Sequence, residues 1–266
     1  MTIDYFDLLS DTPLLFPRVG HIKRVKLGEL RNSEDSIGLT CYNGMLFLFH
    51  ATKQDIVDTV EDASTKSLLQ KLIDKPDISV YDIILLLPSV RGALQESLSY
   101  FLEEGVFYDE KSHSFITYVV SDDKPDPTIV GEITRNNFDE FREVLLQTNH
   151  ISFEKKQDAA VTGNNELLKK WEYAEKMNRD LQNKTDNDDN ATLGNVISKL
   201  CSAGTGITFA NVWDLTVYQA YDQFAQIGYL RSINISERIF TIHGGDNFEF
   251  NSWMNTLHSS DKSQKG

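Results

Sequence analysis

The middle of the chain carries the pattern of a β-hairpin. Residues 107–120 have aromatic and β-branched arms around a polar turn at 109–114, which is typical of two paired strands. A third strand is expected at 128–134. Helical spacing dominates the rest of the chain. The sequence therefore predicts an α+β fold, mostly helical, with a small antiparallel β-sheet in the middle of the chain.

Two helices are expected immediately before the hairpin. Asp82 is predicted to cap a helix over residues 83–87, and Pro88 interrupts that helix because proline cannot continue the backbone hydrogen bonds. A second helix is predicted to start at Ser89 and to end at Gly105.

The front of the chain gives weaker signals. Residues up to about Gly38 are expected to be extended or turn-rich, and the apolar run 39–49 leads to a polar helix that begins near Thr52. After the sheet, Asn136 or Asn137 is predicted to cap a further helix.

Composition divides the chain into three regions. Residues 1–150 are predicted to form an acidic α+β N-terminal domain, and residues 192–266 a helical C-terminal domain that opens with a helix capped by Thr192. Between them, residues 151–191 read as a polar helix followed by a mobile linker, because the tract 183–190 has no apolar anchor.

The rear of the chain is rich in aromatic residues between positions 209 and 224. Large apolar groups recur there at steps of three and four, which predicts one stripe of an amphipathic helix: Trp213, Val217, Ala220, Phe224 and Ile227. Such a stripe faces either a partner protein or the protein's own core, and the sequence leaves both open. The candidate partner-binding residues are Trp171, Trp213, Val217, Tyr221 and Phe224.

The chain is acidic, with a net charge of −14. Residues 1–150 hold 14 Lys and Arg against 25 Asp and Glu, so most of the excess lies in the front. This charge disfavours binding to nucleic acid, whose phosphates it repels. One basic cluster stands against that trend, and its cations are expected to lie on a solvated side: Arg18, His21, Lys23, Arg24, Lys26 and Arg31.

Membrane insertion and secretion are not expected. The longest apolar run, 83–90, is far shorter than the ~20 residues of a membrane span, and the first residues are acidic where a signal peptide is basic. Cys41 and Cys201 are expected to be reduced and buried, as in a cytoplasmic protein.

Familiar catalytic patterns are missing from the sequence. The histidines are dispersed, and we find neither a zinc-binding spacing, a nucleophile elbow nor a phosphate loop. Asp214 and Asp222 are expected to form a polar face of one helix, and residues 242–248 a tight turn that caps a terminal helix over 248–257. We therefore expect no enzyme activity, no cofactor and no metal.

Three blocks of the sequence resemble a poorly characterised family of tailed-bacteriophage proteins encoded among the tail genes. The front block is Asp4-Tyr-Phe-Asp-Leu-Leu9 with Gly20-His-Ile22 and Lys26-Leu-Gly-Glu-Leu30. The middle block runs from Glu132 to Leu145. The rear block runs from Asn211 to Phe224 and continues with His243-Gly-Gly-Asp-Asn-Phe248 and Trp253-Met254.

This resemblance implies a tail assembly chaperone or a closely related tail-morphogenesis protein of a phage or prophage, acting in the bacterial host cytoplasm. Its implied partners are the tape-measure protein and the tail tube protein. The residues themselves add the expectations of a second copy of the chain as an alternative partner, of no nucleic acid and of no membrane. Two alternatives remain: a structural component of the virion tail, neck or baseplate, or an acidic inhibitor or DNA mimic that acts on host machinery.

Overall fold

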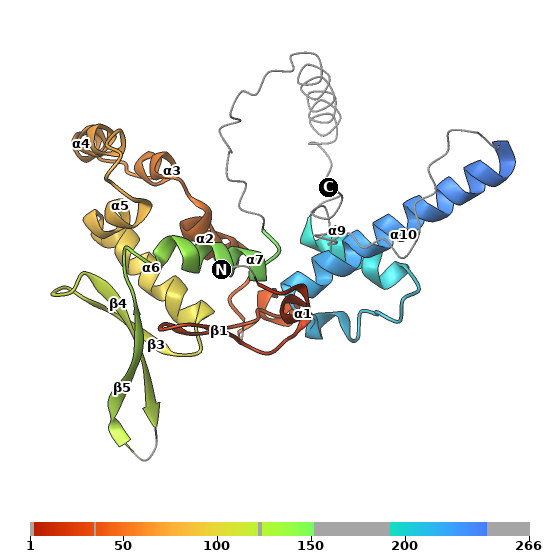
Figure 1. Cartoon of the computed structure of the whole chain (residues 1–266), viewed down its shortest axis with the longest axis horizontal. Coiled ribbons are helices and arrows are strands. Elements are labelled where there is room, and N and C mark those ends of the chain that lie inside the picture. Colours follow the sequence, from red (N-terminus) through yellow and green to blue (C-terminus); the bar gives the residue numbers. More distant parts are fainter. Residues whose placement is uncertain (1–2, 35, 122–123, 152–191, 244–266) are drawn as a thin grey trace, which may run out of the picture. The chain divides into compact units, whose positions relative to one another are not determined.

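A computed structural model describes residues 3–34, 36–121, 124–151 and 192–243 (Figure 1). These residues group into two units. The first contains the described residues up to 151 together with Trp213–Asp222, and the second contains residues 192–212 and 223–243. The fold is α+β and mostly helical with small antiparallel sheets, which confirms the predicted fold class.

The first unit opens with short elements. Helix α1 (Tyr5–Leu9) is followed by strands β1 (Leu14–Phe16) and β2 (Gly20–Ile22), which pair antiparallel, and by the 3-10 helix η1 (Leu27–Leu30). Arg18 takes the left-handed conformation, with φ 60°, in the tight turn between the two strands.

Six α-helices form most of the first unit, and short polar side chains cap several of them. They are α2 (Leu39–His50), α3 (Lys53–Asp58), α4 (Ala63–Ile73), α5 (Val80–Leu86), α6 (Pro88–Phe101) and α7 (Phe138–Thr148) in the ranges described. Thr52 caps α3, as the sequence predicts. The sequence predicts Asp82 as the cap of α5, and this prediction is wrong. Ser79 is the N-cap, and Asp82 is the third residue of the helix, where its side chain accepts from the backbone N–H of Ser79.

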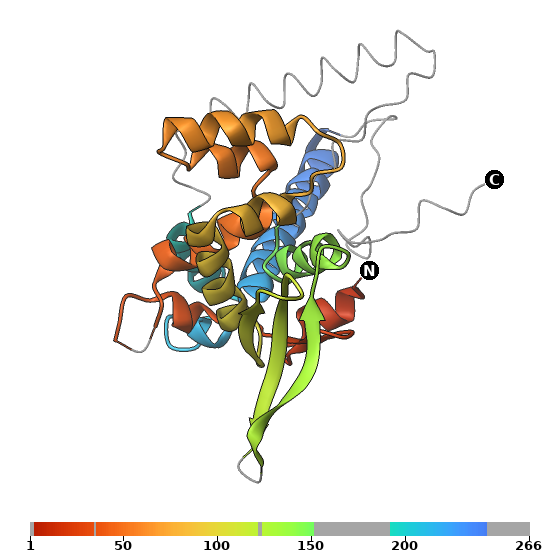
Figure 2. The ribbon, with the colours of Figure 1, turned by 90° about the vertical axis from the view of Figure 1, so that its left-hand side faces the viewer.

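A three-stranded antiparallel sheet follows α6. Its strands are β3 (Gly105–Asp109), β4 (Ser114–Ser121) and β5 (Lys124–Ile133), in the order β3-β4-β5. The predicted hairpin and third strand are confirmed, and β5 begins earlier than expected. Figure 2 shows β4 and β5 extending well beyond the helices of the same unit.

Aromatic side chains fill the core of the first unit. Phe49 lies between Phe101 and Phe141, with ring centroids 5.8 and 6.3 Å away, and Phe16 of β1 meets Phe141 at 5.4 Å. Tyr81 of α5 fixes the sheet to the helices, because its hydroxyl donates to the carbonyls of His113 and Ile133, each at 3.0 Å. The part of one sheet face next to the helices is therefore buried, with Phe115 and Thr117 at 0% exposure, whereas Val119 farther along the same face is 46% exposed.

The rear elements are α9 (Leu193–Ser202), the 3-10 helix η3 (Val212–Asp214) and α10 (Val217–His243). Thr192 caps α9, as predicted. The prediction of one helix from Trp213 onward is wrong. Trp213 belongs to the 3-10 helix η3, and α10 begins only at Val217. The helices predicted at 165–181 and 248–257 and the linker lie outside the described residues.

Candidate protein-binding surface

The side of the β3-β4-β5 sheet that faces away from the helices carries apolar side chains. An antiparallel sheet with one buried face usually has polar residues on the other. Here the alternation along each strand places five apolar residues on the open side, which we call the outer face: Phe107, Ile116, Tyr118, Val120 and Ile129. Phe107 is 41% exposed, Val120 58% and Ile129 67%.

The two aromatic residues of the outer face support one another. The rings of Phe107 and Tyr118 lie 5.7 Å apart between centroids. Tyr118 can lie flat on the sheet because its cross-strand neighbour is Gly105, where a β carbon would come 2.5 Å from the tip of the ring. The missing side chain at position 105 thus leaves room for a flat aromatic platform.

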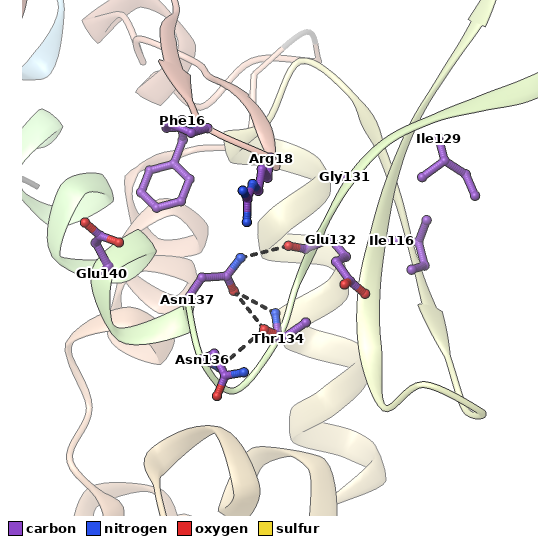
Figure 3. A pocket seen from close by; sticks show the side chains of 11 residues that line it. Phe16, Arg18, Ile116, Ile129, Gly131, Glu132, Thr134, Asn136, Asn137 and Glu140 are labelled. Carbon is purple, nitrogen blue, oxygen red and sulfur yellow. Dashed lines mark hydrogen bonds between the residues drawn. The ribbon is translucent and has the colours of Figure 1, made fainter.

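A groove of about 990 Å³ runs around the edge of β5 and adjoins the outer face (Figure 3). Ile116 and Ile129 line it on the sheet side, and Phe16 and Glu140 line it on the opposite side. Two hydrogen bonds connect residues that line the groove: Asn137 donates to the carbonyl of Glu132 at 2.9 Å and accepts from the backbone of Thr134 at 2.7 Å.

None of the candidate residues predicted from the rear stripe belongs to the outer face. Trp171 is outside the described residues. In the first unit, Val217 is 3% exposed. The guanidinium of Arg31 lies 5.3 Å from the centroid of the Trp213 ring. The ring of Tyr221 stacks on that of His150, with 5.6 Å between the centroids. In the second unit, the ammonium of Lys199 lies 5.5 Å from the Phe224 ring. That these residues bind a partner stays a prediction, while the structure places Val217 in the core.

Two charged residues that were expected to face solvent are buried. Asp222 is 1% exposed and accepts from the hydroxyl of Tyr5 at 3.1 and 3.2 Å. Asp214 is exposed and belongs to η3, so the two carboxylates do not form a polar face of one helix. Arg24 is also buried, and desolvation lowers the pKa of its guanidinium, opposed by Asp7 and Tyr218.

Two lysines of the predicted basic cluster form ion pairs inside the first unit. Lys23 pairs with Glu29 at 2.6 Å, and Lys26 pairs with Asp11 at 3.6 Å. Cys41 and Cys201 are free thiols, but Cys41 is exposed on α2, so the expected burial is wrong there.

The described residues contain no group of three or more His, Cys, Asp or Glu placed to hold a metal ion. Among the same residues, we find no helix with the length and apolar character to span a membrane. His243 is the last described residue of α10, so the turn predicted at 242–248 lies almost entirely outside the described residues.

Sequence reasoning missed the outer face, although a signal was present. In β4 the run Phe115-Ile-Thr-Tyr-Val-Val120 is apolar at positions of both parities, whereas a strand with one solvated side alternates with polar residues. Contiguous exposed apolar surface marks an interaction site. The fold and this surface thus define an α+β protein whose three-stranded sheet has an open apolar face.

Residues 182–258 match the family model of the YomV second domain, and YomV is a protein of the Bacillus prophage SPβ. The match relates this rear region, less than half of the chain, to a prophage protein. No curated protein and no solved structure shows significant similarity to the chain.

Proposed function

We propose that this chain is a non-enzymatic prophage protein that acts in tail assembly by binding a tail protein as a chaperone. The observation that carries the proposal is the apolar outer face, since exposed apolar side chains on a sheet are costly to keep in water and are typical of binding surfaces. The similarity to a prophage domain and the resemblance to tail-gene proteins supply the biological setting.

The implied partners are the tape-measure and tail tube proteins of the same prophage. A tape-measure chain presents long apolar helical faces that aggregate when they are left bare, and a chaperone covers such faces. The net charge of −14 keeps the carrier itself dispersed.

Co-expression tests this proposal. The tape-measure protein is produced in bacteria with and without the full chain, and its soluble and insoluble fractions are compared; the tube protein is tested in parallel. We expect the chain to raise the soluble fraction of one of them and to copurify with it. Unchanged solubility and no copurification for both proteins would contradict the proposal.

Purified particles separate the chaperone from the structural alternative. A chaperone leaves before the tail is complete, so mass spectrometry of particles should not detect the chain at the level of tail proteins. Stoichiometric amounts in the particle would instead make it a component of the tail, neck or baseplate.

A further inference from the structure

We infer that the outer face receives the apolar side of an amphipathic helix whose polar flanks are basic. This inference rests on the proposed function, because it names the kind of segment that the bound protein presents. Its starting point is the cluster on β3, β4 and β5, where Phe107, Val120 and Ile129 are each exposed by 41% or more.

The outer edge of β5 does not favour a partner that adds a strand. At one end of β5, the backbone N–H of Glu132 already donates to the carbonyl of Arg18 at 3.0 Å. Farther along, Pro125 and Pro127 lack an N–H, and prolines in a sheet occupy the outward positions of an edge strand. Three of the positions that a new strand would use on this edge are therefore closed.

The opposite edge of the sheet is also occupied at its centre. The backbone N–H of Tyr108 in β3 donates to the side-chain oxygen of Gln95 in α6 at 3.0 Å. Binding through either edge is thus disfavoured, whereas the outer face is open. An apolar sheet face is covered in folded proteins by a helix or a second sheet, and a single helical segment is the simplest cover for a three-stranded sheet.

The charge around the outer face indicates a basic partner. Exposed carboxylates lie beside β3 and along β5: Glu103, Asp126 and Glu132. Glu132 lies directly beside Ile116 in the register of the sheet, so a charge sits within the apolar surface. The same charge disfavours a second copy of the chain as the occupant, because two molecules of net charge −14 repel each other.

Two synthetic peptides test the inference on the full chain. Both form an amphipathic helix with the same leucine face, and their polar positions hold lysine in one and glutamate in the other. Fluorescence anisotropy measures the affinity of each. We expect the lysine peptide to bind about tenfold more tightly or better, because complementary charge adds to an apolar contact common to both.

Variants locate the binding site. The double substitution V120S and I129S should weaken binding of the lysine peptide about tenfold. The matched control is Leu68→Ser, which removes a leucine that is 64% exposed on α4 and should leave the affinity unchanged. Glu132→Lys should reduce the preference for the lysine peptide by about two- to fivefold. Circular dichroism and urea unfolding confirm that each variant is folded.

Three results would overturn the inference: equal affinity for the two peptides, unchanged binding by the V120S/I129S variant, or an equal loss with Leu68→Ser. Sedimentation velocity tests whether the wild-type chain forms a dimer. A dimer that is lost in the V120S/I129S variant would show that a second copy of the chain covers the outer face, and would overturn the inference. The proposed function fails separately, because a wild-type chain that captures neither tail protein contradicts it whatever the peptides do.

Discussion

The backbone carbonyl of Arg18 lies directly over Gly131, so that a β carbon at position 131 would collide with it. The next residue, Glu132, donates its N–H to the same carbonyl at 3.0 Å, and Thr117 donates its hydroxyl to the carbonyl of Val19 at 2.5 Å. These contacts fix the turn between β1 and β2 to the base of the sheet that carries the outer face.

Gly131→Ala should therefore destabilise the first unit. The added methyl group meets backbone atoms, which cannot rotate away as a side chain can, so we expect the free energy of unfolding to fall by about 1–3 kcal/mol. Urea unfolding measures the change. The matched control is Gly92→Ala in α6, where nothing lies within 4 Å of the added carbon, and which should raise the stability by about 0.5–1 kcal/mol. Equal effects at the two glycines would contradict this account.

Tyr42→Phe should leave a buried acceptor without its donor. The Tyr42 hydroxyl donates to Asn149 Oδ1 at 2.8 Å in the core, and the Asn149 amide nitrogen donates onward to the carbonyl of Leu145 at 2.8 Å. Because the ring of phenylalanine fills the same space, the loss reports on the hydrogen bond, and we expect about 1–3 kcal/mol. Thermal unfolding followed by circular dichroism tests this; an unchanged melting temperature would show that the bond adds nothing.

High pH should unfold the protein through its buried tyrosines. Burial raises the pKa of Tyr42, and burial with the nearby Asp222 raises the pKa of Tyr218 to about 12. An unfolded tyrosine titrates near 10, so above that pH the unfolded chain loses a proton that the folded chain keeps. Stability is therefore complete below pH about 10 and falls as the pH rises, by about 1.4 kcal/mol per pH unit for each such tyrosine.

Urea unfolding at a series of pH values above neutrality measures this dependence. The Tyr42→Phe variant is less stable at neutral pH, but its stability should fall less steeply above pH about 10 because one buried phenol is gone. A slope equal to that of the wild type would mean that Tyr42 ionises normally in the folded chain.

Thr216→Ala should weaken the start of α10. The Thr216 hydroxyl accepts from the backbone of Gln219 at 3.1 Å, and the Gln219 side chain accepts from the backbone of Thr216 at 2.9 Å. This capping box satisfies two donors at the helix start, and its loss should cost about 0.5–2 kcal/mol. Thr216→Ser keeps the hydroxyl and is the control; in urea unfolding it should match the wild type, and an equal loss in both variants would argue against capping.

Local interactions explain which elements the sequence predicted correctly. The hairpin of β3 and β4 follows from strand-forming residues on either side of a polar turn, and α3 and α9 begin where Thr52 and Thr192 accept from backbone donors three residues later. Each of these signals lies within a few residues, so no distant part of the chain is needed to read it.

The start of α10 shows where local reading fails. The apolar spacing from Trp213 onward is helical, yet the backbone N–H of Leu27 donates to Leu215 at 2.9 Å and that of Val217 donates to Val25 at 2.9 Å. Residues 215–217 thus pair with a segment almost two hundred positions earlier, and these hydrogen bonds take the place of helical ones. The burial of Arg24 also depends on residues outside its local sequence, because its guanidinium donates to the carbonyls of Asp7 and Thr12.

The sequence by itself determined the α+β class, the three-stranded sheet and the starts of α3, α7 and α9, since periodicity and capping act over short distances. Only the tertiary structure decided that Val217 and Asp222 are buried while Ile129 and Val120 are exposed. Alternation along a strand tells which side chains share a face, but the packing of distant helices decides which face is covered. No helix of the first unit covers the outer face of the β3-β4-β5 sheet in the described residues, and for that reason the outer face is the candidate binding surface.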